Sequence, residues 1–517
     1  MQTSAQGNSS TTLSATSKSR GWAHWITLVL LLFTCVAGRL VCVACKPFWF
    51  DEAFSVEVAR LTWTNFLHLL WWREANMSLY YVLLRGWLHF GDSPSFIRSL
   101  SVLTAGLTLP AIYWLARLLF DRRVALIAAA LFTFNTYDVR YSQEARSYSL
   151  FVLLATASSG LLVWWLAEPS RRRLRGYVLA SVLAAYAHFY ALLLVVAHWL
   201  VFKLTSPAQI ANQWSASRLR RAWWGIGLLV FPLLVFVAKT GAGPIRWIHR
   251  PGLRDLLQFF EHLCGGDRWP LAVLYLAACT VAIAPVGRRI WKRDPNRDVW
   301  RLQFLLIWLF FPIVLTVLLS LARPVFLGRY MIFCLPPLLV LAAAGLERLR
   351  RPWMLGASLG VMLFLSLQGV FFVYGHDFDS ERDASESASN FILNEAKPTD
   401  AILFHIAETR IPFEFSRSFR VGQDTASPKF TDQLGPEILF PRHGPGLDYR
   451  DFTGKPATNS VRQAASPYPR LWVMLMNNGT ADKPDPTTLM LTQTLAELFP
   501  KVQRWQFAKV EVRLYSK

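Results

Sequence analysis

The hydrophobic residues of the chain are grouped in long blocks, and Arg-rich connectors separate these blocks. Most blocks hold roughly 17–25 residues, the length that an α-helix needs to cross the hydrocarbon layer of a bilayer. The pattern therefore predicts about eleven membrane-spanning helices. We place them at residues 22–43, 96–119, 123–139, 147–167, 174–189, 190–204, 222–240, 269–286, 302–322, 331–346 and 353–374.

Two polar regions flank the first predicted span. Residues 1–20 are rich in Ser, Thr, Gln and Gly, and we expect them to form a disordered cytoplasmic N-terminus. The loop 44–95 contains two aromatic, amphipathic stretches, Phe54–Trp72 and Ser78–Phe90, which are too short or too polar to cross a membrane. We predict that both stretches are helices lying in the membrane interface, where Trp side chains are favoured.

The last part of the chain differs in composition from the rest. From residue 376 onward Asp, Glu, Ser, Pro and Asn become frequent, and a helix-like segment at Ala384–Glu395 precedes three β-like runs. The predicted fold is a polytopic α-helical membrane domain over residues 21–375, followed by a soluble α/β domain over residues 376–517. The β-like runs are Ala401–Ile406, Leu471–Met476 and Val510–Tyr515.

Charge supplies the predicted orientation. The net charge of +21 does not indicate a nucleic-acid partner, because the basic residues follow apolar blocks instead of sharing one soluble face. The basic connectors alternate, and all fall on the side of Lys18 and Arg20, which the positive-inside rule makes cytoplasmic. With an odd number of spans, residues 376–517 lie outside. The clusters are Arg117, Arg122 and Arg123; Arg171, Arg172, Arg173 and Arg175; Lys203, Arg218, Arg220 and Arg221; Arg288, Arg289, Lys292, Arg293 and Arg297; and Arg348, Arg350 and Arg351.

The six cysteines show no metal-ligand pattern. Cys42 and Cys45 have no second pair at zinc-like spacing and no His cluster nearby. The sequence alone does not determine whether Cys42, Cys45 or Cys264 forms a disulfide.

Candidate chemistry lies in four short segments at the outer ends of predicted spans. Ionisable residues near a membrane are costly, so those at span ends are informative. Because all four segments fall on the outer face, we expect them to converge in one cavity. When a hydroxyl group displaces a phosphate leaving group, a carboxylate can act as the base that removes the hydroxyl proton. Arg and His side chains can bind the phosphate and stabilise its charge. The segments are Trp49–Ser55, Arg140–Tyr148, Tyr186–Tyr190 and Arg323–Tyr330.

Each segment also has a purely structural interpretation. Asp51 could cap an interfacial helix, because its carboxylate would accept free backbone N–H groups. Glu144 and Arg146 could form an exposed ion pair, which contributes little. A lone histidine such as His188 is more often a packing residue than a ligand. Arg329 lies against the positive-inside trend, which favours an anionic partner.

Five segments of the chain form an ordered set: Trp49–Ser55, Ser78–Leu84, Tyr141–Tyr148, His188–Tyr190 and Arg329 with Tyr330. Together these segments resemble bacterial members of the GT-C superfamily. The resemblance is closest to the family that groups protein mannosyltransferases with the aminoarabinose transferases acting on lipid A. It implies an inverting transfer of a sugar from a polyprenyl-phosphate donor to a lipid, glycan or protein acceptor, at the outer face of the bacterial inner membrane.

The resemblance also implies roles for individual acidic residues. Asp51 would be the general base that deprotonates the acceptor hydroxyl, with Glu52 beside it. Glu144 would shape the sugar site. The chain departs from the family pattern at Asn76–Ser78, where relatives often have prolines, so the second interfacial helix could begin differently.

The remaining implied roles concern the phosphate and the sugar. Arg146, His188 and Arg329 would bind the donor phosphate, since guanidinium groups suit bidentate contact. Tyr190 and Tyr330 would contact the substrate. No cofactor is required, because Arg and His can neutralise a monophosphate, although a divalent cation could be held by Asp51 and Glu144.

Two other protein classes share some of these features. A transporter or flippase of a lipid-linked sugar would also have many spans and outer charges, but it should show internal repeats and ionisable groups near the midplane. We find neither in the sequence. A scaffolding protein would not need acidic and basic residues on one shared face. The sequence does not identify the sugar or the acceptor.

Overall fold

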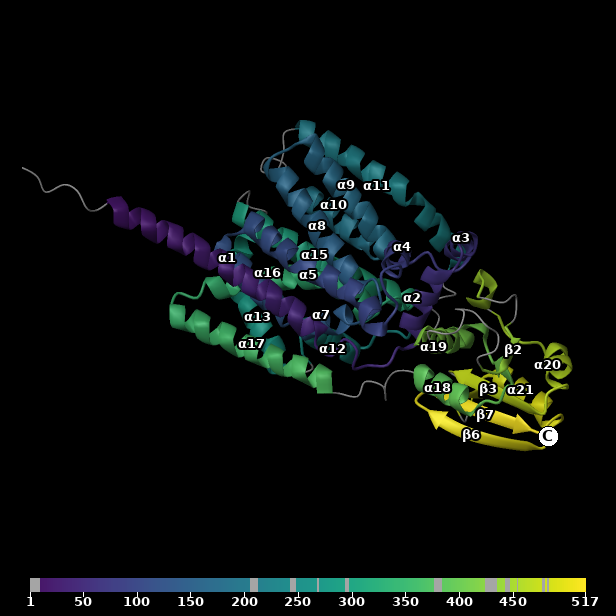
Figure 1. Cartoon of the computed structure of the whole chain (residues 1–517). Coiled ribbons are helices and arrows are strands. Elements are labelled where there is room, and N and C mark those ends of the chain that lie inside the picture. The colour runs from purple at the N-terminus through teal and green to yellow at the C-terminus, as the bar shows by residue number, and fades with distance from the viewer. Residues whose placement is uncertain are drawn as a thin grey trace, which may run out of the picture.

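The computed structural model describes residues 10–204, 213–241, 248–266, 269–292, 297–375, 384–423, 435–441, 447–452, 454–476, 479–480 and 483–517. It forms a bundle of helices with a smaller sheet domain at one end (Figure 1). Helix α1 (Ser10–Leu40) begins inside the segment that composition predicts to be disordered, so the helix starts earlier than expected. Residues 1–9, also predicted to be disordered, lie outside the described residues.

A helix stands at each of the eleven predicted spans. Among the described residues, seven segments are long and apolar enough to cross a membrane, and two apolar helices are shorter. The chain is thus a multi-pass membrane protein. Helices α6 (12 residues) and α9 (17 residues) also lie at predicted spans, but they are shorter than the seven segments. The helices are α1, α5 (Pro94–Leu119), α6 (Arg122–Thr133), α8 (Tyr148–Ala167), α9 (Arg171–Ala187), α10 (Ala191–Leu204), α11 (Gln213–Thr240), α13 (Trp269–Ile283), α15 (Arg297–Ala322), α16 (Leu335–Glu347) and α17 (Pro352–Gly375).

Two predicted spans are interrupted. The predicted span 123–139 ends early, because the Asn135 side chain accepts the Asp138 N–H at 3.0 Å and starts the separate helix α7 (Thr136–Ser142). The predicted span 331–346 begins as a 3₁₀ helix, η3 (Gly328–Cys334). Regular helix α16 follows, with prolines in its first turn, where their missing N–H groups cost nothing.

Close packing of α13 against α16 depends on one glycine. A Cβ atom at Gly345 would lie 1.8 Å from the carbonyl oxygen of Ala278. We therefore expect Gly345→Ala to lower the free energy of unfolding by about 1–3 kcal/mol, because the two helices must move apart. Thermal unfolding in detergent measures the loss. Gly360→Ala in α17 is the control, since a Cβ there meets nothing within 4 Å, and equal effects of both variants would contradict the packing argument.

Several basic connectors meet at one end of the bundle. Arg123, in the first turn of α6, lies 3.9 Å from Glu347 at the end of α16. Arg301, at the start of α15, donates a hydrogen bond to the Leu119 carbonyl at 2.9 Å. Arg348 donates to the carbonyl of Ala282 at the end of α13. Connectors that the charge pattern assigns to one face thus lie together.

The opposite end carries the first long loop, which forms three helices instead of the two predicted. They are α2 (Phe50–Arg60), α3 (Trp63–Trp72) and α4 (Ser78–Trp87). The predicted stretch Phe54–Trp72 is divided, because the Thr62 side chain accepts the Asn65 N–H and caps α3. Helix α3 keeps exposed tryptophans, as an interfacial helix should. Most of α2 is instead buried inside the protein.

The C-terminal domain contains a five-stranded sheet of order β2-β1-β3-β7-β6. The first three strands are parallel and the last two antiparallel. The helix and three strands that the sequence predicts are confirmed, while β2 and β6 were not predicted. The elements are α18 (Ser385–Glu395), β1 (Ala401–Phe404), η5 (Ala407–Thr409), α19 (Arg410–Gln423), β2 (Glu437–Phe440), η6 (Tyr449–Phe452), α20 (Thr458–Ala465), β3 (Arg470–Met476), α21 (Pro486–Ala496), β6 (Lys501–Phe507) and β7 (Val510–Ser516), with the short pair β4 (Gly479–Thr480) and β5 (Lys483–Pro484).

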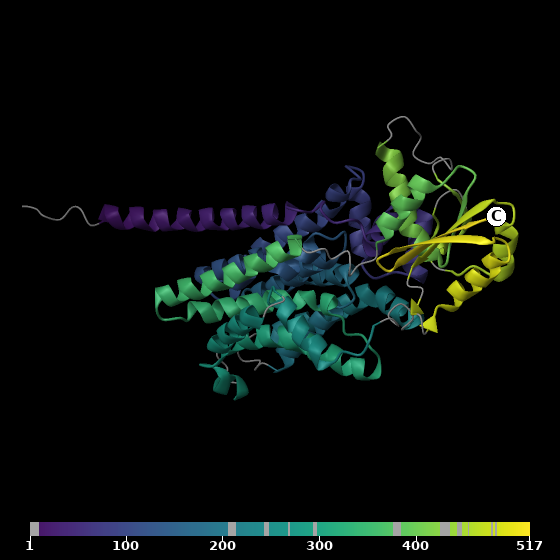
Figure 2. The same cartoon turned by 90° about the horizontal axis from the view of Figure 1, so that it is seen from below.

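This domain packs on α2 through α19 and η6. The rings of Phe48 and Phe415 stack with centroids 4.6 Å apart. Phe54 meets Phe452 edge to face at 5.2 Å. In both views the domain lies at the α2 end of the bundle (Figures 1 and 2). The domain therefore covers the same end of the molecule as the predicted site residues in α2.

Candidate functional site

Asp51 is the meeting point of three predicted site segments. It lies in the first turn of α2, where Trp49 is the N-cap and no side chain caps the helix, so the capping role considered for Asp51 is not observed. Its Oδ2 atom lies 3.6 Å from Nη2 of Arg146 and 3.9 Å from Nη2 of Arg329. The side chain keeps 21% of its surface exposed. The predicted convergence of these distant residues is therefore present.

Arg146 is buried beside α2. Its Nη1 atom donates to the Asp51 carbonyl at 3.3 Å and lies 3.5 Å from Oγ of Ser55. Its Nε has no hydrogen-bond partner among the described residues. A buried N–H without a partner is costly, so this donor is available to a ligand that enters the site.

Glu52 lies next to Asp51 in sequence but has different partners. Arg98 of α5 donates Nε to Oε1 at 2.8 Å and Nη2 to Oε2 at 2.7 Å, and the Ala145 N–H donates to Oε1 at 2.8 Å. The side chain is fully buried. Glu52 therefore does not lie beside the Asp51 carboxylate as the resemblance implies, and it joins α2, α5 and the connector that carries Arg146.

His188 lies in the turn after α9 within an aromatic cluster. Its ring stacks on Phe151 at 5.0 Å and lies 4.9 Å from the ring of Tyr330 and 5.4 Å from that of Tyr190. Burial lowers the pKa of His188 to about 3, and the charges of Arg146 and Arg329 contribute to the same shift. The ring is thus neutral at physiological pH, so it lacks the positive charge that the predicted phosphate contact assumes.

The tautomer of His188 is set by its backbone contact. Nδ1 accepts the Tyr190 N–H at 3.3 Å, which leaves the proton on Nε2. Nε2 is buried and has no hydrogen-bond partner among the described residues. The neutral ring can therefore still donate one hydrogen bond to an anion.

The other predicted residues surround this centre. Glu144 is buried in the α7–α8 connector, where its charge acts on Tyr141. Burial is the main reason that the pKa of Tyr141 rises to about 12. The rings of Tyr190 and Tyr330 lie 5.3 Å apart, and the Tyr190 hydroxyl donates to the Val325 carbonyl. In the described part of the chain, no three His, Cys, Asp or Glu side chains are grouped as metal ligands.

Three further residues at this site were not among the predicted ones. The hydroxyls of Tyr81 and Tyr148 are buried without hydrogen-bond partners among the described residues. Glu74 lies in the α3–α4 connector, and burial raises its pKa to about 7. The charge of Arg146 lowers this pKa, and that of Asp51 raises it. Glu74 is not part of any sequence motif. The nearest indication in the sequence is the segment Ser78–Leu84, which contributes to the family resemblance.

A disulfide joins Cys42 and Cys45 in the turn after α1. Arg98 donates a hydrogen bond to the Val43 carbonyl inside this turn at 2.8 Å. Gln143 donates to the Val41 carbonyl just before it at 2.7 Å. The turn is therefore held by the same side chain that pairs with Glu52.

The fold of this chain is similar to the folds of several solved structures. ArnT from Cupriavidus metallidurans in the apo state matches with a TM-score of 0.58 and 12% identity, over 96% of this chain and 98% of that chain. The same protein bound to undecaprenyl phosphate matches with a TM-score of 0.54 over the same shares. The oligosaccharyltransferase of Archaeoglobus fulgidus, in a complex with Zn and sulfate, gives 0.50 at 12% identity, over 75% of this chain and 61% of that chain.

No protein-family model and no curated protein matches the sequence. The likeness in three dimensions nevertheless extends over nearly the whole chain, including the C-terminal domain. The chain is therefore a polytopic membrane protein whose fold is similar to that of these solved structures.

Proposed function

We propose that this protein is a membrane glycosyltransferase that moves a sugar from a polyprenyl-phosphate donor to a hydroxyl group of a lipid, glycan or protein acceptor. The observation that carries the proposal is the set of buried, unpartnered donors around Asp51. Nε of Arg146 and Nε2 of His188 both lack partners among the described residues, and Arg329 supplies a second guanidinium. Such a set suits the phosphate of a glycosyl phosphate ester.

The chemistry follows from this arrangement. Asp51 accepts the proton of the acceptor hydroxyl, whose oxygen attacks the anomeric carbon from the face opposite the phosphate. A new glycosidic bond forms as the bond between the anomeric carbon and the phosphate oxygen breaks, with inversion of configuration. Arg146, Arg329 and the neutral His188 stabilise the charge on the departing lipid phosphate. Glu144 and the tyrosine pair Tyr190 and Tyr330 shape the sugar site.

The solved neighbours support the donor class. One ArnT structure contains undecaprenyl phosphate, and an archaeal AglB structure of 9% identity and TM-score 0.50 contains dolichol-phosphate and an inhibitory peptide. Both lipids are polyprenyl chains that carry phosphate. A shared fold does not by itself give a shared reaction, so the assignment to this chain depends on its own residues.

We place the site on the extracytoplasmic face of a bacterial inner membrane, with the N-terminus in the cytoplasm. The basic connectors at the opposite end support this orientation through the positive-inside rule. The Cys42–Cys45 disulfide supports it too, since disulfides persist in oxidising compartments. Covalent labelling of single cysteines introduced at Asp92 and at Arg123, both exposed, from each side of sealed vesicles would test the orientation.

Reconstituted vesicles test the enzyme against a transporter. Purified protein in proteoliposomes, given a radiolabelled polyprenyl-phosphate sugar and an envelope extract as acceptor, should release free polyprenyl phosphate and a labelled product. A transporter would move the intact donor across the bilayer without cleaving it. The same assay with and without EDTA measures whether a divalent cation contributes.

Glu74 gives a pH-dependence that this function makes measurable. Because its pKa is raised to about 7, Glu74 is neutral below that pH and negative above it. The negative form competes with the donor phosphate for Arg146, so KM for the donor should rise as the pH increases through about 7. Glu74→Gln should flatten this rise, whereas Glu168→Gln at the far end should keep it. An unchanged pH profile in Glu74→Gln would contradict the competition.

A further inference from the structure

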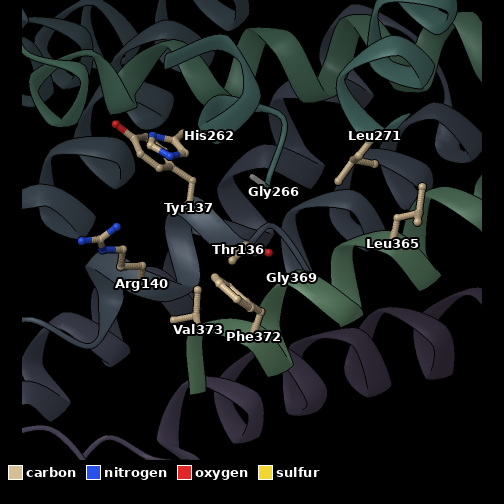
Figure 3. Close-up of a pocket in the computed structure, with 10 residues that line it drawn as sticks. All are labelled: Thr136, Tyr137, Arg140, His262, Gly266, Leu271, Leu365, Gly369, Phe372 and Val373. Atoms are coloured by element: carbon tan, nitrogen blue, oxygen red, sulfur yellow. The ribbon is translucent and has the colours of Figure 1, made fainter. Parts of the chain in front are cut away.

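A cavity at the end of the bundle opposite Asp51 is lined mainly by charged side chains. It lies between the α5–α6 connector, the start of α15 and the end of α16, and its volume is about 300 Å³. A cavity nearer the candidate site, between α7, α13, α17 and the segment that follows α12 (Leu253–Leu263), differs in kind, since Figure 3 shows the aliphatic residues Leu271 and Leu365 at one side of it. The charged cavity contains three carboxylates and two guanidinium groups, which belong to Asp121, Asp298, Glu347, Arg301 and Arg348.

The charged cavity lies at the depth where three membrane spans end. The apolar segments Pro94–Leu119 and Gly328–Glu347 end beside it, and the segment Asp298–Ala322 begins there. Residues at the ends of spans lie at the level of the lipid headgroups. Ionisable side chains near a membrane are costly unless they are paired, so a group of five at one place indicates a partner. A headgroup of the adjoining leaflet lies within reach of this cavity.

Contacts within the protein fix the walls of the charged cavity. Asp298 forms an ion pair with Arg301, and Nη1 of Arg301 donates to the Leu119 carbonyl at 2.9 Å. Oδ1 of Asp121 accepts two backbone N–H groups, at 2.8 and 3.0 Å, in the first turn of α6. These contacts hold the α5–α6 connector against the start of α15, so the cavity is preformed.

One basic and one acidic side chain of this cavity keep capacity for a ligand. Nε of Arg301 is buried and has no hydrogen-bond partner among the described residues. The side chain of Glu347 is 29% exposed, and it lies 3.9 Å from that of Arg123, which is 81% exposed. An ion pair at this distance with so exposed a partner contributes little. A ligand that satisfies both groups must therefore carry an anion and a cation.

We propose that the charged cavity binds a phosphoethanolamine group, the headgroup of a zwitterionic phospholipid in the adjoining leaflet. The phosphate accepts hydrogen bonds from Arg301 and Arg348, and the primary ammonium donates to Asp121 and Glu347. The two guanidinium groups repel a bare divalent cation, and the carboxylates repel an anion that has no cationic part. The inference does not depend on the proposed sugar transfer, because no residue of the Asp51 site takes part.

Native mass spectrometry of the full-length protein tests the choice of headgroup. Given equal amounts of phosphatidylethanolamine, phosphatidylglycerol and phosphatidylcholine with identical acyl chains, the protein should retain the first about tenfold better, because only a primary ammonium donates charge-assisted hydrogen bonds to the carboxylates. Glu347→Gln should remove most of this preference. Glu168→Gln is the matched control, since it changes a 73% exposed carboxylate at the same end of the bundle. Equal retention of the three lipids, or an unchanged preference in Glu347→Gln, would overturn the proposal.

Thermal unfolding distinguishes a lipid headgroup from a free compound with the same chemistry. Phosphatidylethanolamine and water-soluble O-phosphoethanolamine are added separately to the delipidated full-length protein in detergent, and to Glu347→Gln. A ligand that binds the folded protein raises its unfolding temperature. A rise with the lipid alone assigns the site to the membrane, a rise with both compounds shows that the group suffices, and in either case Glu347→Gln should show a smaller rise. No rise with either compound, or the same rise in Glu347→Gln, would refute the site.

Discussion

Asp51→Asn is expected to lower kcat for sugar transfer by about 10²–10⁴-fold, the range that a positioned general base contributes. The amide keeps the size of the carboxylate but cannot accept the acceptor proton. Donor binding should be retained, because the neutral amide no longer competes with the phosphate for Arg146 and Arg329, which lie 3.6 and 3.9 Å from the native carboxylate. Release of labelled polyprenyl phosphate gives kcat, and equilibrium binding of the donor gives Kd.

A matched pair of controls distinguishes loss of the base from loss of the fold. Asp92→Asn changes an exposed carboxylate in the same outer loop and should leave kcat unchanged. Arg329→Met should instead weaken donor binding, since it removes a phosphate ligand. Turnover in Asp51→Asn at the rate of the unmodified protein would remove Asp51 from the role of base.

The second large effect is expected on stability, at the neighbouring residue. Glu52→Gln should lower the free energy of unfolding by about 3 kcal/mol or more, because Arg98 would then be a buried charge without its counter-ion. Both side chains of this pair are at most 1% exposed. Thermal unfolding in detergent measures the loss relative to the unmodified protein.

An exposed ion pair provides the comparison. Glu168→Gln breaks the pair with Arg173, whose distance of 2.6 Å is equally short, but Glu168 is 73% exposed. Water already solvates that carboxylate, so the expected loss is about 0–1 kcal/mol. If both variants unfolded at the same temperature, the structural role of Glu52 would be wrong.

The Glu52 pair also connects stability to the proposed chemistry. Its Oε1 atom accepts the Ala145 N–H, which precedes Arg146 in the same connector. A shift of that connector would move the guanidinium that contacts Asp51. Glu52→Gln should therefore also reduce kcat/KM for the donor at temperatures where the variant is still folded.

The sequence by itself predicted the positions of the spans and the end of the bundle at which the candidate site residues meet. The length of an apolar block and the placement of arginine are local properties of the chain, and the bilayer acts on each block separately. Positions at span ends therefore predicted that Asp51, Arg146 and Arg329 would meet. The three predicted strands of the C-terminal domain could also be recognised from the sequence, because a strand pattern is a local property of the chain.

Only the tertiary structure decided which side chains share an environment. Asp51 and Glu52 are adjacent acidic residues with the same local pattern, yet one faces two guanidinium groups and the other is buried against Arg98 of α5. Burial of His188 and of Glu74 changes their protonation through neighbours that are distant in sequence. The packing of α19 on α2 and the cavity beside α17 likewise depend on long-range contacts. Hydrophobic pattern specifies where a helix lies along the chain, but side-chain packing between helices sets the partners and charges of each residue.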